Sequence, residues 1–91
     1  ALHFLHQSQE IYDLVLLDLF SQDGNPLLLF QAPIYQALAR CLHGTLIVNL
    51  LPRTHLELAQ AKRLAEEWIG PTSAHGVPGY RNVILHATNL A

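Results

Sequence analysis

The chain has 91 residues, 51% of them hydrophobic and 13% Asp, Glu, Lys or Arg, and its formal net charge is −2. This length gives at most one domain, and the five Lys and Arg residues do not cluster, so nothing in the charge favours nucleic-acid binding. No apolar run reaches the ~20 residues of a membrane span, and a single cysteine, Cys41, excludes an internal disulfide. We therefore expect a cytoplasmic protein, or a piece of one, with part of its charge-poor surface normally covered.

The first predicted strand, Tyr12 to Asp18, is the segment around which the chain is organised. Leu14 to Leu17 is an unbroken apolar run with an aspartate at each end, a pattern typical of a parallel strand covered on both faces by helices. Asp18 ends this strand where open α/β sheets place their ligand-binding crevice. Residues 1–9 predict the end of a helix that has no start signal, which indicates that the chain begins inside an element.

A second helix and a second strand follow a segment dense in turn-forming residues, Ser21 to Pro26. The helix is predicted to begin near Pro33, because the first turn needs no N–H there, and to end at Gly44 as a left-handed cap. Its apolar stripe consists of Ile34, Leu38 and Cys41. Thr45 to Leu51 is then predicted as an apolar strand, which Asn49 interrupts.

The third helix carries the clearest start signal, because Thr54 and Glu57 have the spacing of a capping box, and Gly70-Pro71 ends it. Its predicted buried face consists of Leu58, Ala61, Ala65 and Trp68. A short strand at Thr72 to Ala74 and a closing strand at Asn82 to Thr88 are joined by a loop too short for a helical crossover, so they should pair antiparallel. The alternation predicts an α/β fold with parallel strands, right-handed crossovers and an antiparallel closing hairpin.

Several segments, taken in order, are similar to one known family. They are Tyr12–Asp18 (YDLVLLD), Asp23–Pro26 (DGNP), the helix around Ile34-Tyr35, Gly44–Asn49 (GTLIVN) and Val77–His86 (VPGYRNVILH). In this order and spacing they resemble spermidine-synthase-like proteins, the polyamine aminopropyltransferases, whose catalytic domain has the Rossmann-like fold of class I S-adenosylmethionine-dependent methyltransferases. The resemblance covers nearly the whole chain but only the C-terminal half of that domain, so it implies a single partial domain over residues 1–91.

The resemblance also implies a set of site residues. Asp18 and Asp23 would be the catalytic carboxylates, which bind a cationic amine acceptor and take its proton. Ser21 and Asn49 would contact the substrate, and Ala1 would contact the cofactor as the second residue of an adenine-binding Asp-Ala pair. The cofactor, in the parent protein, would be S-adenosylmethionine or its decarboxylated form. The family's glycine-rich loop and its ribose-binding carboxylate have no counterpart in this sequence.

One departure from the family pattern concerns the reaction centre. Ser21 stands where spermidine synthases carry a second Asp, so Asp23 would have to supply the second charge. Structural roles are open for the same residues: Asp18 as a strand-end cap, Asp23 in an Asx turn before Gly24, and Asn49 as a partner for loop backbone. Leu27 to Phe30 is either an apolar lid over the substrate or ordinary packing.

Two other interpretations of the residues are weaker. His3 and His6 have a chelating i, i+3 spacing on a helix, but no cysteine or acidic residue stands near them, so we expect no metal site. Residues 12–19 also resemble the phospho-acceptor strand of receiver domains. Those domains need a Pro soon after the acceptor and a later Lys, and neither Phe20 to Gln22 nor Lys62 meets that need.

We therefore expect one of two functions. The first is a fragment, inactive by itself, of a transferase that moves an aminopropyl or methyl group to an amine or another small acceptor. The second is a non-catalytic or degenerate family member that serves as a structural module. Because the family's first strand is absent here, one edge of Tyr12 to Asp18 should be unpaired. We expect a homodimer or association with the N-terminal half, and no nucleic-acid or membrane partner.

Overall fold

The computed structural model describes residues 11–19 and 26–89. The elements of these ranges, in chain order, are β1 (Tyr12–Leu17), the 3-10 helix η1 (Leu27–Phe30), α2 (Ala32–Cys41), β2 (Leu42–Leu50), α3 (His55–Trp68), β3 (Thr72–Gly76) and β4 (Val83–Asn89). The predicted helix over residues 1–9 and nearly all of the predicted turn over residues 21–26 lie outside the described residues.

The described strands form one sheet in the order β1-β2-β4-β3. β1 and β2 are parallel, joined by a connection that contains η1 and α2, whereas β4 runs antiparallel to both of its neighbours. The predicted α/β sheet with parallel strands and an antiparallel closing hairpin is thus confirmed. The strands are longer than predicted at three ends, because β2 begins at Leu42, β3 runs on to Gly76 and β4 reaches Asn89.

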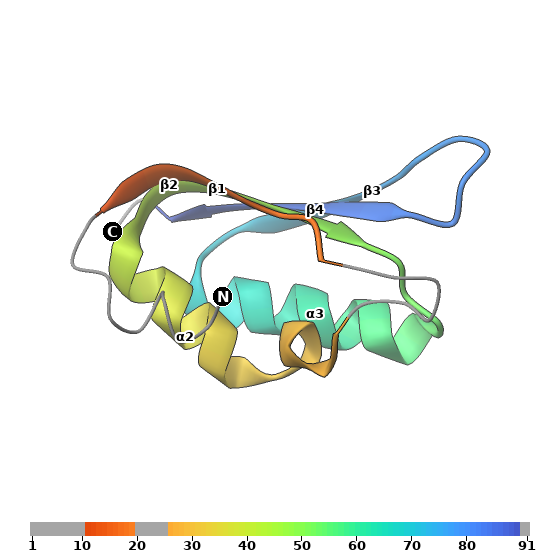
Figure 1. Ribbon diagram of the computed structural model, residues 1–91, viewed down its shortest axis with the longest axis horizontal. Helices are drawn as coiled ribbons and strands as arrows, with labels where there is room; N and C mark the ends of the chain where they lie inside the picture. Colours follow the sequence, from red (N-terminus) through yellow and green to blue (C-terminus); the bar gives the residue numbers. More distant parts are fainter. Residues whose placement is uncertain (1–10, 20–25, 90–91) are drawn as a thin grey trace.

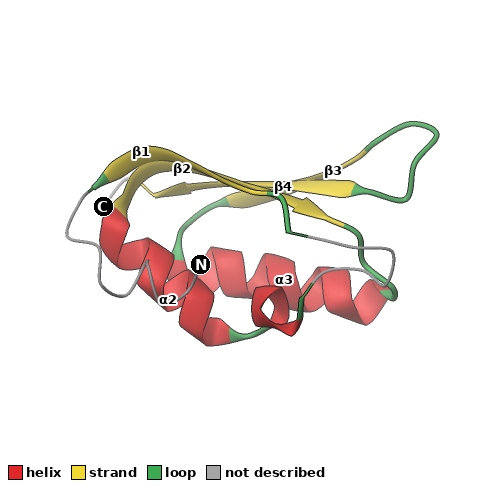
Figure 2. Cartoon of the chain, in the orientation of Figure 1, coloured by secondary structure: helices red, strands yellow, loops and turns green. Residues whose placement is uncertain are grey.

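The helices form a second layer under one face of the sheet (Figures 1 and 2). Side chains of a strand alternate between its two faces, and on this side Leu46, Val48 and Leu50 of β2 have no exposed surface. The core between the layers also contains Leu17, Leu29, Phe30, Ile34, Tyr35, Leu38, Leu42, Ala61, Leu64, Ala65, Ile69, Leu85 and Ala87. Leu29 and Phe30 are part of this core, so the packing role of η1 is the one that the structure supports.

The opposite face of the sheet carries no helix in the described part of the chain. Leu14 and Leu16 of β1 are 59% and 63% exposed on this side. The next strand continues the apolar surface, because Leu16 pairs with Ile47 in the β1–β2 register. Among the described residues, helices therefore cover only one face of β1. β1 packs one face against the core and exposes the other face to solvent.

The start of α3 confirms the predicted capping box with one change. The Thr54 hydroxyl accepts a 3.1 Å hydrogen bond from the Glu57 backbone N–H. The Glu57 carboxylate reaches back one residue further than expected and accepts from the backbone N–H of Arg53, at 2.8 Å. At the other end, Trp68 is 37% exposed, so its predicted place on the buried face is wrong. The buried residues of α3 are Ala61, Leu64 and Ala65.

Gly44 was expected to cap the second helix, but α2 ends at Cys41 and Gly44 lies inside β2. Its φ is +150°, and a Cβ at this position would overlap the backbone carbonyl of Asp13. The β1–β2 register shifts here, from Tyr12 opposite Leu42 to Leu14 opposite Thr45. The glycine therefore serves the close approach of two strands at a bulge, and does not end a helix.

Candidate functional site

A hydrogen bond joins the carboxyl ends of the two parallel strands. Asp18 directly follows β1, and Asn49 is the penultimate residue of β2. The Asn49 side-chain nitrogen donates to a carboxylate oxygen of Asp18 at 3.1 Å. Asp18 is exposed and Asn49 is half-buried. Two residues 31 positions apart in the sequence thus meet at the edge where open α/β sheets bind ligands.

Asn82 extends this pair into a chain of three side chains, which we call the Asp18–Asn49–Asn82 cluster. The Asn82 side-chain nitrogen donates to the Asn49 side-chain oxygen at 3.1 Å. Because an ionised carboxylate only accepts hydrogen bonds, the Asn49 amide must turn its nitrogen to Asp18 and its oxygen to Asn82. The Asp18 carboxylate is therefore held from the side of β2 while the rest of it faces solvent.

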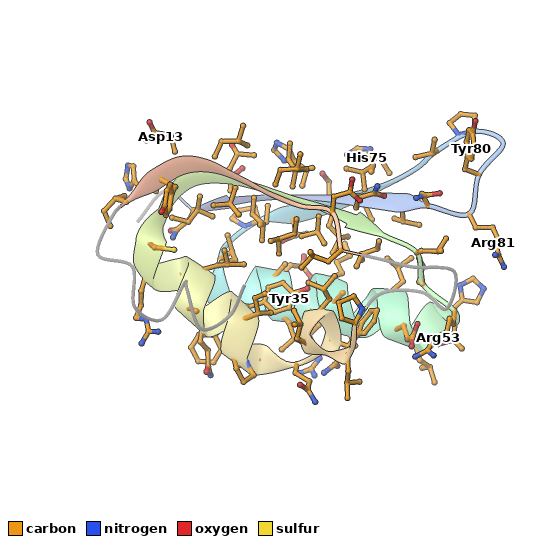
Figure 3. All side chains as sticks on the ribbon, in the orientation of Figure 1. Asp13, Tyr35, Arg53, His75, Tyr80 and Arg81 are labelled. Carbon is orange, nitrogen blue, oxygen red and sulfur yellow. The ribbon has the colours of Figure 1, made fainter. Side chains whose placement is uncertain are left out.

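The antiparallel register explains why Asn82 reaches this edge. Leu50 of β2 lies opposite Val83 of β4, so the amino end of β4 meets the carboxyl end of β2. A cavity of about 320 Å³ adjoins the cluster here. It is lined by Asn49, Val77, Tyr80, Asn82 and Ile84. Figure 3 shows Tyr80 at the outer end of the β3–β4 hairpin, and its side chain is 74% exposed.

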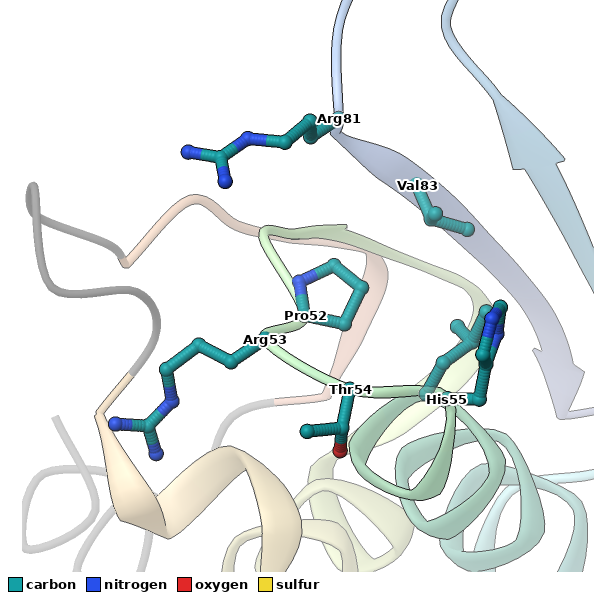
Figure 4. Close-up of a pocket in the computed structure, with 7 residues that line it drawn as sticks. Pro52, Arg53, Thr54, His55, Arg81 and Val83 are labelled. Atoms are coloured by element: carbon teal, nitrogen blue, oxygen red, sulfur yellow. The ribbon is translucent and has the colours of Figure 1, made fainter.

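A second cavity, of about 340 Å³, lies on the same edge where the chain leaves β2 and enters α3 (Figure 4). Its lining residues are Pro52, Arg53, Thr54, His55, Leu58, Arg81 and Val83. Extending the β2–β4 register by two residues places Arg81 across from Pro52. The two cavities lie on opposite faces of the sheet, because Val83 faces α3 together with Leu50, whereas Asn82 and Ile84 face the other side with Asn49. We call the second one the arginine cavity.

One arginine of this cavity is already engaged. Arg53 Nη2 and Nε lie 2.8 Å and 3.2 Å from the same Glu57 carboxylate oxygen. The side-chain hydrogen bonds from Arg53, followed by the bond from its backbone N–H, lower the pKa of Glu57 below its ordinary value. Arg81, in contrast, forms no ion pair with any residue of the described ranges.

The structure places the predicted site residues in two groups. Asp18 and Asn49 are brought into contact, as a shared site requires. Ala1, Ser21 and Asp23 lie outside the described residues.

Asn82, Arg53 and Arg81 were missed as site residues. The signal that places Asn82 and Arg81 is the antiparallel pairing of β4 with β2, which the predicted hairpin alone did not give. Arg53 directly precedes the predicted cap residue Thr54. The Glu57 carboxylate, which reaches back over this cap, accepts hydrogen bonds from the Arg53 backbone and side chain.

The described residues show neither a metal-binding cluster nor a membrane span. Within ranges 11–19 and 26–89, no group of three His, Cys, Asp or Glu side chains is placed to hold a metal ion. Among the helices of these ranges, none is both long and apolar enough to cross a bilayer.

Comparison with known proteins finds a solved structure with a similar fold. No family model matches the sequence, and no curated protein matches it. Among solved structures, the crystal structure of human Methyltransferase-like protein 13 in complex with SAH superposes with a TM-score of 0.83 at 17% sequence identity. The match covers 97% of this chain and 44% of that one, so the chain spans less than half of its neighbour. The chain therefore has the fold of part of a methyltransferase-like, Rossmann-type sheet.

Proposed function

We propose that this chain is the C-terminal half of the catalytic domain of an S-adenosylmethionine-dependent transferase. The observation that carries the proposal is the Asp18–Asn49 contact at the carboxyl edge of β1 and β2. The fold around this contact matches part of an SAH-bound methyltransferase over 97% of the present chain. SAH is what S-adenosylmethionine becomes once its methyl group has been transferred. Ligands bind outside the carboxyl ends of the strands in open α/β sheets, which is where this polar contact lies.

The chemistry of Asp18 suits a reaction with a positively charged donor. A sulfonium donor supplies an alkyl carbon with a good leaving group, because the electron pair of the broken C–S bond stays on sulfur. Asp18 is exposed, and its carboxylate attracts a cationic amine acceptor to this edge. It accepts a hydrogen bond from that amine and receives the proton that the amine must lose before or during attack. Asn49 holds the carboxylate in place through its amide.

The finer proposal is that the acceptor is an amine, and that the group transferred is aminopropyl or methyl. Asp23 would add the second carboxylate that a polyamine substrate favours, with Ser21 and Asn49 beside it. Decarboxylated S-adenosylmethionine would be the donor for aminopropyl transfer. Support for this level comes from the resemblance of the segments around Asp18 and Gly44 to spermidine-synthase-like proteins. We place the parent protein in the cytoplasm.

The partner that we propose is another polypeptide chain: a second copy of this one or the N-terminal half of the transferase. β1 is an outer strand of the sheet formed by the described residues, and an open strand edge recruits further strands. Leu14 and Leu16 offer apolar surface beside that edge. The alternative function is a structural module, which would associate through the same edge of β1 but would not catalyse alkyl transfer.

Turnover of the whole parent protein tests the proposal. Asp18→Asn should lower the rate of alkyl transfer from S-adenosylmethionine at least about tenfold, because a charged hydrogen bond is worth ~1.5 kcal/mol or more. Asp13→Asn is the matched control, since Asp13 is an exposed aspartate at the other end of β1. Figure 3 shows Asp13 at the end of the sheet opposite Arg81. Equal turnover by wild type and Asp18→Asn would support the structural alternative.

A further inference from the structure

The Asp18–Asn49–Asn82 cluster lies on the face of the sheet that carries no helix in the described ranges. The β2 residues on both sides of Asn49 are buried against the helices, so Asn49 points to the opposite face. Asn49 is paired with Ile84 of β4, and Asn82, two residues before Ile84, lies on the same face. The 3.1 Å bond between the two asparagine side chains agrees with this placement. One polar connection therefore runs from the amino end of β4 to the carboxyl end of β1 on a single face.

The backbone of the β3–β4 hairpin fixes the point from which the Asn82 side chain starts. Residues 77–80 form a turn in which the Tyr80 N–H donates to the Val77 carbonyl at 3.0 Å. Gly79, the third residue of this turn, has a φ of +81°, as a type II turn requires. The Val77 N–H donates to the Asn82 carbonyl at 3.2 Å. Both bonds are made by the backbone, so a change of the Asn82 side chain leaves them in place.

The orientation of the Asn49 amide decides which group faces Asp18. A side-chain amide donates through its nitrogen and accepts through its oxygen. In the observed orientation the Asn49 nitrogen donates to Asp18, whereas a half rotation of the amide would bring two acceptor groups together. Asn82 donates to the Asn49 oxygen and so favours the observed orientation. Asn82 thus acts on Asp18 through the amide of Asn49.

We propose that Asn82 is a positioning residue for the carboxylate of Asp18, and that it acts by fixing the orientation of the Asn49 amide. The inference rests on the proposed function, in which Asp18 binds the amine acceptor and receives its proton. A carboxylate with one fixed rotamer has its oxygens in place before the acceptor arrives, whereas a rotating one must be ordered in each turnover. The β3–β4 hairpin thereby contributes to a reaction centre to which it supplies no reacting group.

Two substitutions of Asn82 separate positioning from simple packing. In Asn82→Asp the new side chain has nearly the same shape but cannot donate, so the Asn49 amide should turn its nitrogen to the new carboxylate and its oxygen to Asp18. In Asn82→Ala the Asn49 oxygen turns to water, and the bond to Asp18 persists in part. Positioning therefore predicts that the change of equal shape is the more damaging one. A side chain that only fills space would show the opposite order.

NMR on the isotope-labelled 91-residue chain measures the arrangement directly. Three-bond couplings to the Cβ protons of Asp18 report whether its χ1 has one rotamer or an average of several. The side-chain N–H signals of Asn49 report the hydrogen bond. Wild type is compared with Asn82→Asp, Asn82→Ala and Gln36→Glu, and the backbone amides of residues 77–80 show whether the hairpin is retained. Gln36→Glu is the matched control, because it makes the same amide-to-carboxylate change at an exposed residue of α2.

We expect one Asp18 rotamer in wild type and in Gln36→Glu, partial averaging in Asn82→Ala, and the strongest averaging in Asn82→Asp, with the hairpin amides unchanged. Asn49→Ala should release Asp18 as well. Adding Asn82→Asp to that variant should produce no further change, because the two side chains act in series. An averaged Asp18 in wild type, a larger effect of Asn82→Ala than of Asn82→Asp, or a further change in the double variant would each overturn the proposal.

Turnover of the parent protein tests what the arrangement is for. Asn82→Asp should lower kcat for an amine acceptor about tenfold, as a misplaced catalytic group does. Its KM should not rise, because the added carboxylate attracts the cationic acceptor. An unchanged kcat in Asn82→Asp, beside the expected loss in Asp18→Asn, would overturn the positioning role and keep the proposed function. A parent without alkyl transfer would overturn the proposed function, while the NMR comparison, which needs no donor, still decides whether Asn82 orients Asp18.

Discussion

The hydroxyl of Tyr35 donates a 2.7 Å hydrogen bond to the backbone carbonyl of Leu29. Neither residue has exposed surface, and Figure 3 shows Tyr35 among the helices. The bond ties α2 to η1. The position of η1 relative to α2 therefore depends on a contact in the core.

Removing the hydroxyl should destabilise the fold. We expect Tyr35→Phe to lower the free energy of unfolding by about 1–2 kcal/mol, because a buried carbonyl loses its partner. Tyr80→Phe is the control, since Tyr80 is 74% exposed and its change should stay within about 0.5 kcal/mol. Chemical denaturation measures both. Equal stability of Tyr35→Phe and wild type would mean that another donor, such as water, reaches the Leu29 carbonyl.

Alkaline pH should destabilise the chain through the same residue. Burial raises the pKa of the Tyr35 phenol, so the neutral form is favoured in the folded state. This contribution to stability is fully present below the unfolded-state pKa of about 10 and is lost as pH rises above it. Thermal unfolding followed from neutral pH to beyond about pH 10 should show a steeper loss of stability in wild type than in Tyr35→Phe. If stability falls equally with pH in wild type and in Tyr35→Phe, Tyr35 is not the source of the alkaline destabilisation.

Acid should weaken the start of α3. The bonds from Arg53 lower the pKa of Glu57, so the stabilisation is present above the ordinary glutamate pKa of about 4.3 and is lost as pH falls through the lowered value. Glu57→Gln should cost ~0.5 kcal/mol at neutral pH, the size expected of a partly exposed pair, and nothing at strongly acidic pH. Glu66→Gln is the comparison, because Glu66 lies 3.7 Å from Lys62 and far from the start of α3. If the two variants show the same dependence on pH, the cap is not its source.

A methyl group at residue 44 should disrupt the contact between β1 and β2. The Cβ of Gly44→Ala would overlap the Asp13 carbonyl at a backbone φ of +150°. We expect a loss of more than about 2 kcal/mol in the free energy of unfolding. A Cβ on Gly76 would meet no atom of the described residues within 4 Å, so Gly76→Ala should cost far less. Chemical denaturation of both variants checks this, and similar losses would indicate that β1 and β2 separate at little cost.

Self-association should depend on the open face of β1. We expect the chain to form dimers at micromolar concentration, and Leu16→Lys to shift it toward monomer, because Leu16 is 63% exposed beside the strand edge. Leu56→Lys is the matched control, since Leu56 is 81% exposed on α3. Analytical ultracentrifugation measures each. A monodisperse monomeric wild type with a cooperative melt would contradict the prediction, as would an equal effect of both substitutions.

The elements that local chemistry controls could be predicted from the sequence. The Thr54 cap, the two parallel strands and the antiparallel hairpin each follow from a pattern within a few residues, and the structure confirms them. Asp18 and Asn49 could be placed on one edge, because parallel strands end on the same side of a sheet. Long-range geometry accounts for the rest. Gly44 has the position of a helix cap in the sequence, and the Asp13 carbonyl that requires a glycine there comes from another strand.

Long-range geometry also explains two further differences between the sequence-based prediction and the structure. Trp68 has the spacing of a buried residue on α3, but it is exposed and the next residue, Ile69, is buried in the core instead. The link from Asn49 to Asn82 depends on which strand lies beside β2, and the sequence pattern alone leaves that neighbour undetermined. Residues of the arginine cavity come from three segments, the β2–α3 loop, α3 and the amino end of β4, so the cavity exists only in the assembled sheet.

The strand order also determines when this sheet can form during synthesis. β4 follows β3 in the sequence but lies between β2 and β3, and the Asn89 side chain donates to the Leu42 carbonyl across 47 positions. A growing chain that has not yet produced Val83 therefore holds β2 and β3 without the strand that joins them. Pairing of such distant segments is slow, and exposed strand edges aggregate. A ribosome-bound chain should therefore expose unpaired edges of β2 and β3 until β4 has emerged.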